Sequence, residues 1–148
     1  MNYTILDLDN CISNDGWRQH WLGDTNSFSR NKKLEAYHSG CGIDDFNWYP
    51  DIPFPENVVI FTGRPIKYIL ATKLWLAKNN INTDLVYMRP NGNKMPSHIL
   101  KMHFLKMFLE ANPGAVIDMA YDDRAIVLEM YKKQGIQQTM KRINKNVI

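Results

Sequence analysis

Cysteine is scarce in this chain, and several common sequence signals are absent. The only cysteines, Cys11 and Cys41, match neither a metal-ligand spacing nor a disulfide framework. No apolar run approaches the roughly 18 residues that a membrane helix needs, and no signal peptide precedes the first apolar segment. No glycine-rich loop ends in Gly-Lys-Ser or Gly-Lys-Thr, which argues against a kinase. We therefore expect a cytoplasmic protein with reduced thiols and no membrane partner.

The rest of the composition is typical of one ordinary globular domain. Hydrophobic residues make up 45% of the 148 residues and charged residues 22%. A chain of this length can bury its own core, so we expect residues 1–148 to form a single domain. The net charge of +3 suits an anionic substrate but is too small to indicate a nucleic-acid-binding surface by itself.

Apolar segments of strand length alternate with segments of helical periodicity. The pattern predicts strands over 3–9, 57–61, 84–88, 115–121 and within 136–143. It predicts helices over 65–79, from 97 onward and over 124–135, with short helical pieces at 17–22 and 31–38. Strands that alternate with helices of this length are typical of an α/β fold. We expect a Rossmann-like parallel sheet with helices on both faces.

Acidic residues follow two of the predicted strands. Asp7 and Asp9 come directly after an apolar run, and Asp122 and Asp123 end another. Carboxylates held close together repel each other, so such pairs favour a bound cation or a proton held for chemistry. Because functional groups collect at the carboxyl ends of parallel strands, we expect these acids to converge. The pattern indicates a metal-assisted reaction.

Two further segments belong to the same predicted edge. Thr62, Gly63 and Arg64 follow the strand predicted over 57–61, and they supply a hydroxyl, a flexible backbone and a cation. Lys101 lies near the start of a predicted helix. These groups are suited to binding an anion such as phosphate.

The order of these motifs resembles that of haloacid dehalogenase-type phosphatases. The segments that carry the resemblance are Asp7-Leu8-Asp9-Asn10, Thr62-Gly63-Arg64, Lys101 and Asp122-Asp123. Within that superfamily the chain is most similar to the phosphatase domain of phage-type polynucleotide kinases and to related small phage phosphatases. That likeness rests on residues 61–65, 87–92, 121–124 and 127–131, and it is strongest from about 58 to 135. If the protein is phage-encoded, its compartment is the cytoplasm of the host cell.

The resemblance assigns roles to the acidic residues. Asp7 is the expected nucleophile, which forms an aspartyl-phosphate. Asp9 is the expected general acid and then general base, with a pKa raised to keep a proton available. The expected cofactor is Mg²⁺, held by Asp7, the backbone carbonyl of Asp9, Asp122 and Asp123. Which of Asp122 and Asp123 touches the metal directly stays open.

The resemblance also assigns the phosphate-binding groups. Thr62 and Lys101 are expected to bind phosphate oxygens, and Gly63 lets the backbone approach them. Lys94 and Lys106 compete for the role of Lys101.

Arginines are the expected contacts to the rest of the substrate. Arg18 and Arg89 match arginines of the resembled family, and Arg64 follows the phosphate-binding pair. Each can meet a second phosphate or a nucleic-acid backbone. We interpret residues 10–55 as a short cap-like insertion that leaves the cleft open to a bulky substrate.

Three features depart from the resembled family. Residues 50–57 contain three prolines where the family has a long helix. Ser97 stands where an acid normally orients the lysine, and Cys11 stands where threonine or serine is usual. We do not expect Cys11 to be a nucleophile, because Asp7 fills that role.

The sequence thus favours a Mg²⁺-dependent phosphomonoesterase that acts on a 3′-phosphate of a DNA or RNA end. The first alternative is a 5′-nucleotidase acting on (deoxy)nucleoside monophosphates. The second is a catalytically silent binding module with the same fold. A nucleotide or nucleic-acid end is the expected partner, and the sequence implies no protein partner.

Overall fold

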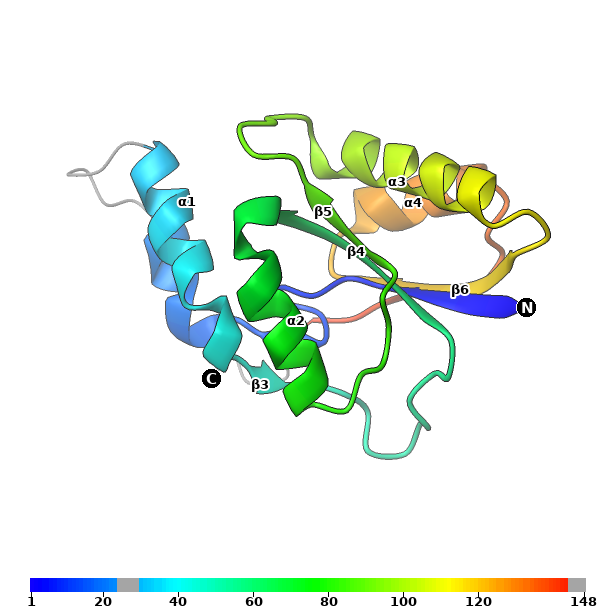
Figure 1. Ribbon diagram of the computed structural model, residues 1–148, viewed down its shortest axis with the longest axis horizontal. Coiled ribbons are helices and arrows are strands. Elements are labelled where there is room, and N and C mark those ends of the chain that lie inside the picture. Colours follow the sequence, from blue (N-terminus) through cyan, green and yellow to red (C-terminus); the bar gives the residue numbers. More distant parts are fainter. Residues whose placement is uncertain (24–29, 144–148) are drawn as a thin grey trace.

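The computed structural model describes residues 1–23 and 30–143, which build an α/β fold around a five-stranded sheet (Figure 1). The strands are β1 (Asn2–Leu6), β4 (Val58–Pro65), β5 (Val86–Arg89), β6 (Val116–Asp122) and β7 (Thr139–Lys141). Their order is β5-β4-β1-β6-β7, and every neighbouring pair is parallel. The Rossmann-like fold class expected from the sequence is confirmed.

Helices connect the strands and cover both faces of the sheet. They are α2 (Ile69–Lys78), which follows the 3₁₀ turn η3 (Ile66–Tyr68), α3 (Ser97–Ala111) and α4 (Ala125–Lys133). Because side chains alternate along a strand, Ile5 and Val59 pack toward α3 and α4, whereas Leu6 and Ile60 pack toward α2. The two hydrophobic cores lie on opposite faces of the sheet.

The insertion after β1 forms a small substructure of its own. It contains β2 (Ser13–Asn14), η1 (Gly16–Leu22), α1 (Arg30–Ser39), η2 (Cys41–Ile43) and β3 (Asp45–Phe46), and β2 pairs with β3 in antiparallel fashion. In Figure 1, α1 and η1 (cyan and blue) stand beyond the carboxyl end of β1, at the left of the sheet. The insertion is therefore placed next to the edge where the acidic motifs lie.

Aromatic side chains take the place of the helix that the proline-rich segment excludes. Between β3 and β4 the described chain forms no helix. Trp48 packs edge-on against Phe54 and Tyr121, with ring centroids 5.0 and 5.1 Å apart. The Arg142 guanidinium lies 3.7 Å from the centroid of the Tyr49 ring and ties the end of β7 to the same cluster. These rings cover the sheet without a helix.

Candidate active site

Acidic residues from neighbouring strands lie together at the carboxyl edge of the sheet. Asp7 directly follows β1, which ends earlier than the predicted 3–9, and Asp122 ends β6. The parallel register pairs Leu6 with Tyr121, so the next residue on each strand is one of these acids. Together with Asp123, they place one carboxylate oxygen each within 4.8 Å of the others. The predicted convergence of these three acids is present in the structure.

The ammonium group of Lys101 joins two of these acids. Its Nζ donates to Asp7 Oδ1 at 3.0 Å and to Asp122 Oδ2 at 2.6 Å. The Lys101 side chain is 3% exposed, whereas Lys94 and Lys106 are exposed. Lys94 lies on the wall of the adjoining pocket, and Lys106 does not line it. The structure thus brings Lys101 to the acids, and Asp7 and Asp122 hold its ammonium group in place.

The electrostatics of the cluster favour an additional cation. Burial, and then the neighbouring charge of Asp122, raise the pKa of Asp7 well above its usual value. Burial also raises the pKa of Asp123, to about 6. For Lys101, burial acts to lower the pKa, but Asp122 and Asp7 outweigh it and raise the pKa. One ammonium group therefore leaves part of the repulsion between the three carboxylates uncompensated.

The turn after β1 is fixed by its own backbone. The N–H groups of Cys11 and Ser13 both donate to the Leu8 carbonyl, at 3.0 and 2.9 Å. Asn10 has φ 57°, in the left-handed region that asparagine tolerates better than most residues. Its Nδ2 donates to Asp123 Oδ2 at 3.2 Å, which links this turn to the end of β6.

Asp9 lies between two arginines, and this corrects our expectation about its pKa. Arg18 Nη2 donates to Asp9 Oδ1 at 2.6 Å, and Arg64 Nη2 donates to the same oxygen at 2.7 Å. Burial acts to raise the pKa of Asp9, but Arg64 and then Arg18 outweigh it and hold the pKa well below its usual range. The predicted raised pKa is wrong for this structure, because both cations favour the carboxylate form.

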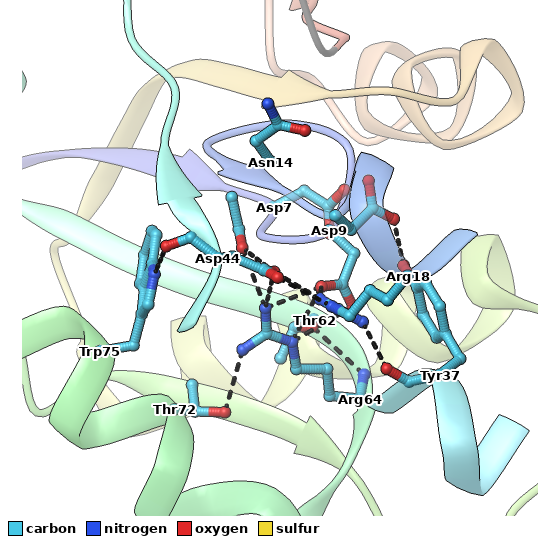
Figure 2. A network of polar contacts seen from close by, with 12 residues as sticks. Asp7, Asp9, Asn14, Arg18, Tyr37, Asp44, Thr62, Arg64, Thr72 and Trp75 are labelled. Carbon is cyan, nitrogen blue, oxygen red and sulfur yellow. Dashed lines mark hydrogen bonds and ion pairs between the residues drawn. The ribbon is translucent and has the colours of Figure 1, made fainter. Parts of the chain in front are cut away.

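The same two arginines are buried rather than open to a substrate (Figure 2). Arg18 Nη1 donates to the Tyr37 carbonyl at 3.0 Å, and Arg64 Nη1 donates to Thr72 Oγ1 at 3.2 Å. Neither arginine lines the pocket next to the acids. The sequence placed both against the substrate, whereas the structure places both against Asp9, since tertiary contacts of the insertion enclose them.

Asp44 is a member of this network that the sequence did not identify. It is buried, and its carboxylate accepts from Arg18 Nε at 2.9 Å, from Arg18 Nη2 at 2.5 Å and from Trp17 Nε1 at 2.9 Å. Ser13 Oγ also donates to it, at 2.5 Å. A single aspartate in an irregular insertion belongs to no motif and no periodic pattern, so no sequence signal distinguished Asp44 from its exposed neighbour Asp45.

A pocket of about 1190 Å³ opens over the acidic cluster. Asp7, Asp9, Lys101 and Asp123 all line it. Its wall also carries cationic side chains, namely Arg30, Lys67, Arg89, Lys94 and Arg124. A pocket with acids at one place and several cations around them can hold an anionic ligand together with a metal ion.

The last residues of β4 lie at one side of this pocket. Gly63 lines the pocket, whereas Thr62 is buried behind it and its Oγ1 accepts from the Arg64 N–H at 3.2 Å. Arg89 is half-buried and uses Nε to donate to the Gly63 carbonyl at 3.0 Å and Nη1 to donate to the Met95 carbonyl at 2.6 Å. Arg89 therefore lines the pocket and also links the end of β4 to the segment before α3.

Solved structures share the fold, although no protein-family model and no curated protein matches the chain. A chain of the Pnkp1/Rnl/Hen1 RNA repair complex is 21% identical, with a TM-score of 0.63, over 95% of this chain. A chain of a second structure of the Pnkp1/Rnl/Hen1 complex is 20% identical, with a TM-score of 0.64, over 99% of this chain. The present chain spans less than half of each, 42% and 46%. At this identity the likeness shows the fold.

Membrane insertion through a helix finds no support in the structure. None of the helices formed by residues 1–23 and 30–143 combines the length and apolar character that crossing a bilayer requires.

Proposed function

We propose that this chain is a Mg²⁺-dependent phosphomonoesterase that removes a 3′-phosphate from a DNA or RNA end. The observation that carries the proposal is the cluster of Asp7, Asp122 and Asp123 at the carboxyl ends of β1 and β6. Lys101 donates hydrogen bonds to Asp7 and Asp122 of this cluster. The resemblance of four sequence motifs to those of haloacid dehalogenase-type phosphatases also supports a phosphomonoesterase. We propose that Asp7 is the nucleophile and passes through an aspartyl-phosphate.

The acidic cluster fits a magnesium ion by its chemistry. Its donors are carboxylate oxygens within 4.8 Å of one another, and hard oxygen ligands in small number suit Mg²⁺ better than zinc. Burial and, second, the charge of Asp122 raise the pKa of Asp7, and burial raises the pKa of Asp123, so a divalent cation beside them would favour their carboxylate forms. We propose Asp7, Asp122, Asp123 and the backbone carbonyl of Asp9 as the residues that would hold it. When bound, the ion neutralises charge on the carboxylates and on the substrate phosphate.

The residues of the chain then divide the reaction into two steps. In the first, an Asp7 carboxylate oxygen bonds to phosphorus, the bond from phosphorus to the sugar oxygen breaks, and Asp9 gives its proton to that oxygen. In the second, a water oxygen bonds to phosphorus, the bond from phosphorus to the Asp7 oxygen breaks, and inorganic phosphate leaves. Asp9 takes the proton that the water gives up. Lys101 stabilises the negative charge that spreads over the phosphate oxygens, and the backbone at Gly63, which lines the pocket, binds them.

Asp9 must take up a proton before it can donate one, and we propose that it does so when substrate is bound. Without substrate, Arg64 and Arg18 hold Asp9 in its carboxylate form. A phosphate dianion next to Asp9 acts in the opposite direction, because a neighbouring like charge raises the pKa of a carboxyl group. We propose that substrate binding raises the pKa of Asp9 and so prepares it as the acid.

Two observations support a nucleic-acid end as the substrate class. The pocket is large, and its wall carries several cations besides Lys101, such as Arg30, Arg89 and Lys94. Such positions suit phosphates beyond the one that is removed. The structural neighbours come from an RNA repair complex, which fits the processing of polynucleotide ends. A chain that acts in such a setting could also meet a protein partner.

Phosphate release in Mg²⁺ tests the proposal directly. The substrates are a 3′-phosphorylated oligonucleotide, a 5′-phosphorylated one, the deoxynucleoside monophosphates and an aryl phosphate. Wild type is compared with Asp7→Asn and with Asp118→Asn, a matched change at an exposed acid of β6. We expect release from the 3′ end that is lost in Asp7→Asn and kept in Asp118→Asn. Release from monophosphates alone would favour the nucleotidase, and no release from any substrate would favour the binding module.

A further inference from the structure

Arg89 brings to the pocket wall a positive charge that has only neutral partners within residues 1–23 and 30–143. It ends β5, is half-buried and lines the pocket that Asp7 and Lys101 also line. Its Nε donates to the Gly63 carbonyl at 3.0 Å and its Nη1 donates to the Met95 carbonyl at 2.6 Å. A guanidinium group stays charged at pH 7, and burial without a counter-charge costs free energy. This position therefore favours a ligand that supplies a negative charge.

One nitrogen of this guanidinium group keeps most of its capacity to donate. Nη2 carries two N–H groups, and its partner among the described residues is Ser97 Oγ, at the long distance of 3.5 Å. A Cβ atom at position 63 would lie 3.5 Å from Nη2 and 3.6 Å from this hydroxyl oxygen, so Gly63 leaves space in front of both groups. Gly63, Arg89 and Ser97 all line the pocket. An anionic oxygen in this space can accept hydrogen bonds from the guanidinium and the hydroxyl together.

This space lies beside the position expected for the phosphate that is removed. Ser97 and Lys101 are four residues apart on α3, which places their Cβ atoms about 5–6 Å apart on one face of the helix. Lys101 Nζ donates to Asp7 and Asp122, whereas no hydrogen bond or ion pair within the described part of the chain joins Arg89 to an acid. The pocket thus has two neighbouring positions for anions, at a separation that one nucleotide can bridge.

We infer that Arg89 and Ser97 bind the phosphodiester on the 5′ oxygen of the terminal nucleotide, next to the 3′-phosphate that is removed. This inference rests on the proposed function and names the second group that the pocket recognises. A 3′-phosphate ends its strand, so its nearest neighbouring phosphate is the one on the 5′ oxygen of the same nucleotide. A free nucleoside 3′-monophosphate lacks that group. The two side chains therefore favour a strand end over a mononucleotide.

The test uses two substrates built on one nucleoside, each with a 3′-phosphate. One carries a methyl phosphodiester on its 5′ oxygen, and the other carries the uncharged dimethyl phosphotriester. A phosphomonoesterase releases neither ester as inorganic phosphate, so the released phosphate comes from the 3′ position alone. The measured quantity is kcat/KM for the diester divided by kcat/KM for the triester. This ratio isolates the charge of the second phosphate, because the two esters have nearly the same size.

Three variants test the assignment to Arg89 and Ser97. Arg89→Met removes the guanidinium group. Ser97→Asp keeps this group and its contacts to the carbonyls of Gly63 and Met95, but it places a carboxylate beside Nη2. Lys94→Met removes one positive charge from an exposed side chain of the same pocket wall. Thermal unfolding reports whether each variant folds, and Ser97→Asp decides the question if Arg89→Met does not fold.

We expect wild type to favour the diester by about tenfold, near the lower end of what a hydrogen bond to a charged group supports. The ratio should fall close to one in Arg89→Met and in Ser97→Asp, because each removes the uncompensated charge. It should stay within about twofold of the wild-type value in Lys94→Met. A wild-type ratio of one, an unchanged ratio in Arg89→Met, or an equal fall in Lys94→Met would overturn the inference.

Two further arms separate this inference from the proposed function. Turnover of an aryl phosphate, which has no second phosphate, reports whether the wild-type chain is a phosphatase at all. Dissociation constants of the diester and the triester are measured in Asp7→Asn, with and without Ser97→Asp, where no turnover is needed. If the aryl phosphate and both nucleotides resist hydrolysis, the proposed function fails. The ratio of dissociation constants then decides the role of Arg89 and Ser97 by the same criterion.

Discussion

Lys101 Nζ donates to Asp7 Oδ1 at 3.0 Å, although 94 positions separate the two residues in the sequence. The same nitrogen donates to Asp122 Oδ2 at 2.6 Å, and all three side chains are buried. A single ammonium group thus offsets two carboxylates that would otherwise repel each other across the ends of β1 and β6. The stability of this edge and its proposed chemistry depend on the same contact.

The first prediction concerns the loss of that ammonium group. Lys101→Met leaves Asp7 and Asp122 buried without their cation, which we expect to destabilise the protein by about 3–5 kcal/mol. Urea unfolding in the presence of EDTA measures the change in the free energy of unfolding. Lys106→Met, at an exposed position on the same helix, should change it by less than about 0.5 kcal/mol. Equal effects of the two substitutions would contradict the pairing.

The second prediction concerns magnesium. An ion that binds the native cluster stabilises the fold by mass action, by about 2.7 kcal/mol at a concentration 100 times its dissociation constant. We expect Mg²⁺ to raise the melting temperature of wild type by several degrees relative to EDTA. Asp123→Asn should remove most of this rise, because it deletes one charge from the three-acid cluster. Asp118→Asn, on an exposed position of β6, should keep it. A rise of the same size in Asp123→Asn would argue against magnesium at this cluster.

The third prediction concerns acid destabilisation through His38. Burial lowers the pKa of His38 from 6.5 to about 4, so between these values the unfolded chain binds a proton that the folded chain does not. This contribution to stability is present above pH 6.5 and is lost as the pH falls toward 4, by at most about 3 kcal/mol. Unfolding curves measured from pH 7 to pH 4 give the slope. His38→Phe should reduce the slope over this interval, and His103→Phe should not.

The parallel sheet and the position of the acids at its carboxyl edge were predictable from the sequence. Parallel strands must present their carboxyl ends together, so acids that follow two apolar runs converge whatever the details of packing. Asp7 and Asp122 meet for this reason. The sequence favoured Lys101 over Lys94 as the phosphate-binding lysine but did not exclude Lys94. Which lysine reaches the site depends on how the helix packs, and the sequence does not give that packing.

The insertion could not be derived in the same way. Its residues follow no strand or helix period over most of their length, so no face of it was predictable as buried. The sequence therefore placed Arg18 and Arg64 against the substrate and missed Asp44. In the structure both arginines are buried against Asp9, which reverses the predicted direction of its pKa shift. The charges were visible in the sequence, but their partners were not.

The last prediction concerns Asp44, the buried acid that pairs with Arg18. Asp44→Asn removes the charge that faces Arg18 Nε and Nη2, at 2.9 and 2.5 Å. Breaking one side of a buried ion pair leaves the other charge uncompensated, so we expect a loss of about 3–5 kcal/mol in the free energy of unfolding. Asp45→Asn is the matched control, because Asp45 is the next residue and is exposed.

A double-mutant cycle separates the pair from the rest of the network. If the cost of Asp44→Asn comes from the charge left on Arg18, then Arg18→Met in the Asp44→Asn background should cost clearly less than Arg18→Met alone. Additive effects of the two substitutions would show that Asp44 stabilises the insertion through Ser13 and Trp17 instead. Arg18 also donates to Asp9, the proposed acid. The rate of phosphate release by Asp44→Asn therefore shows whether the charge of Asp44 affects catalysis through its contact with Arg18.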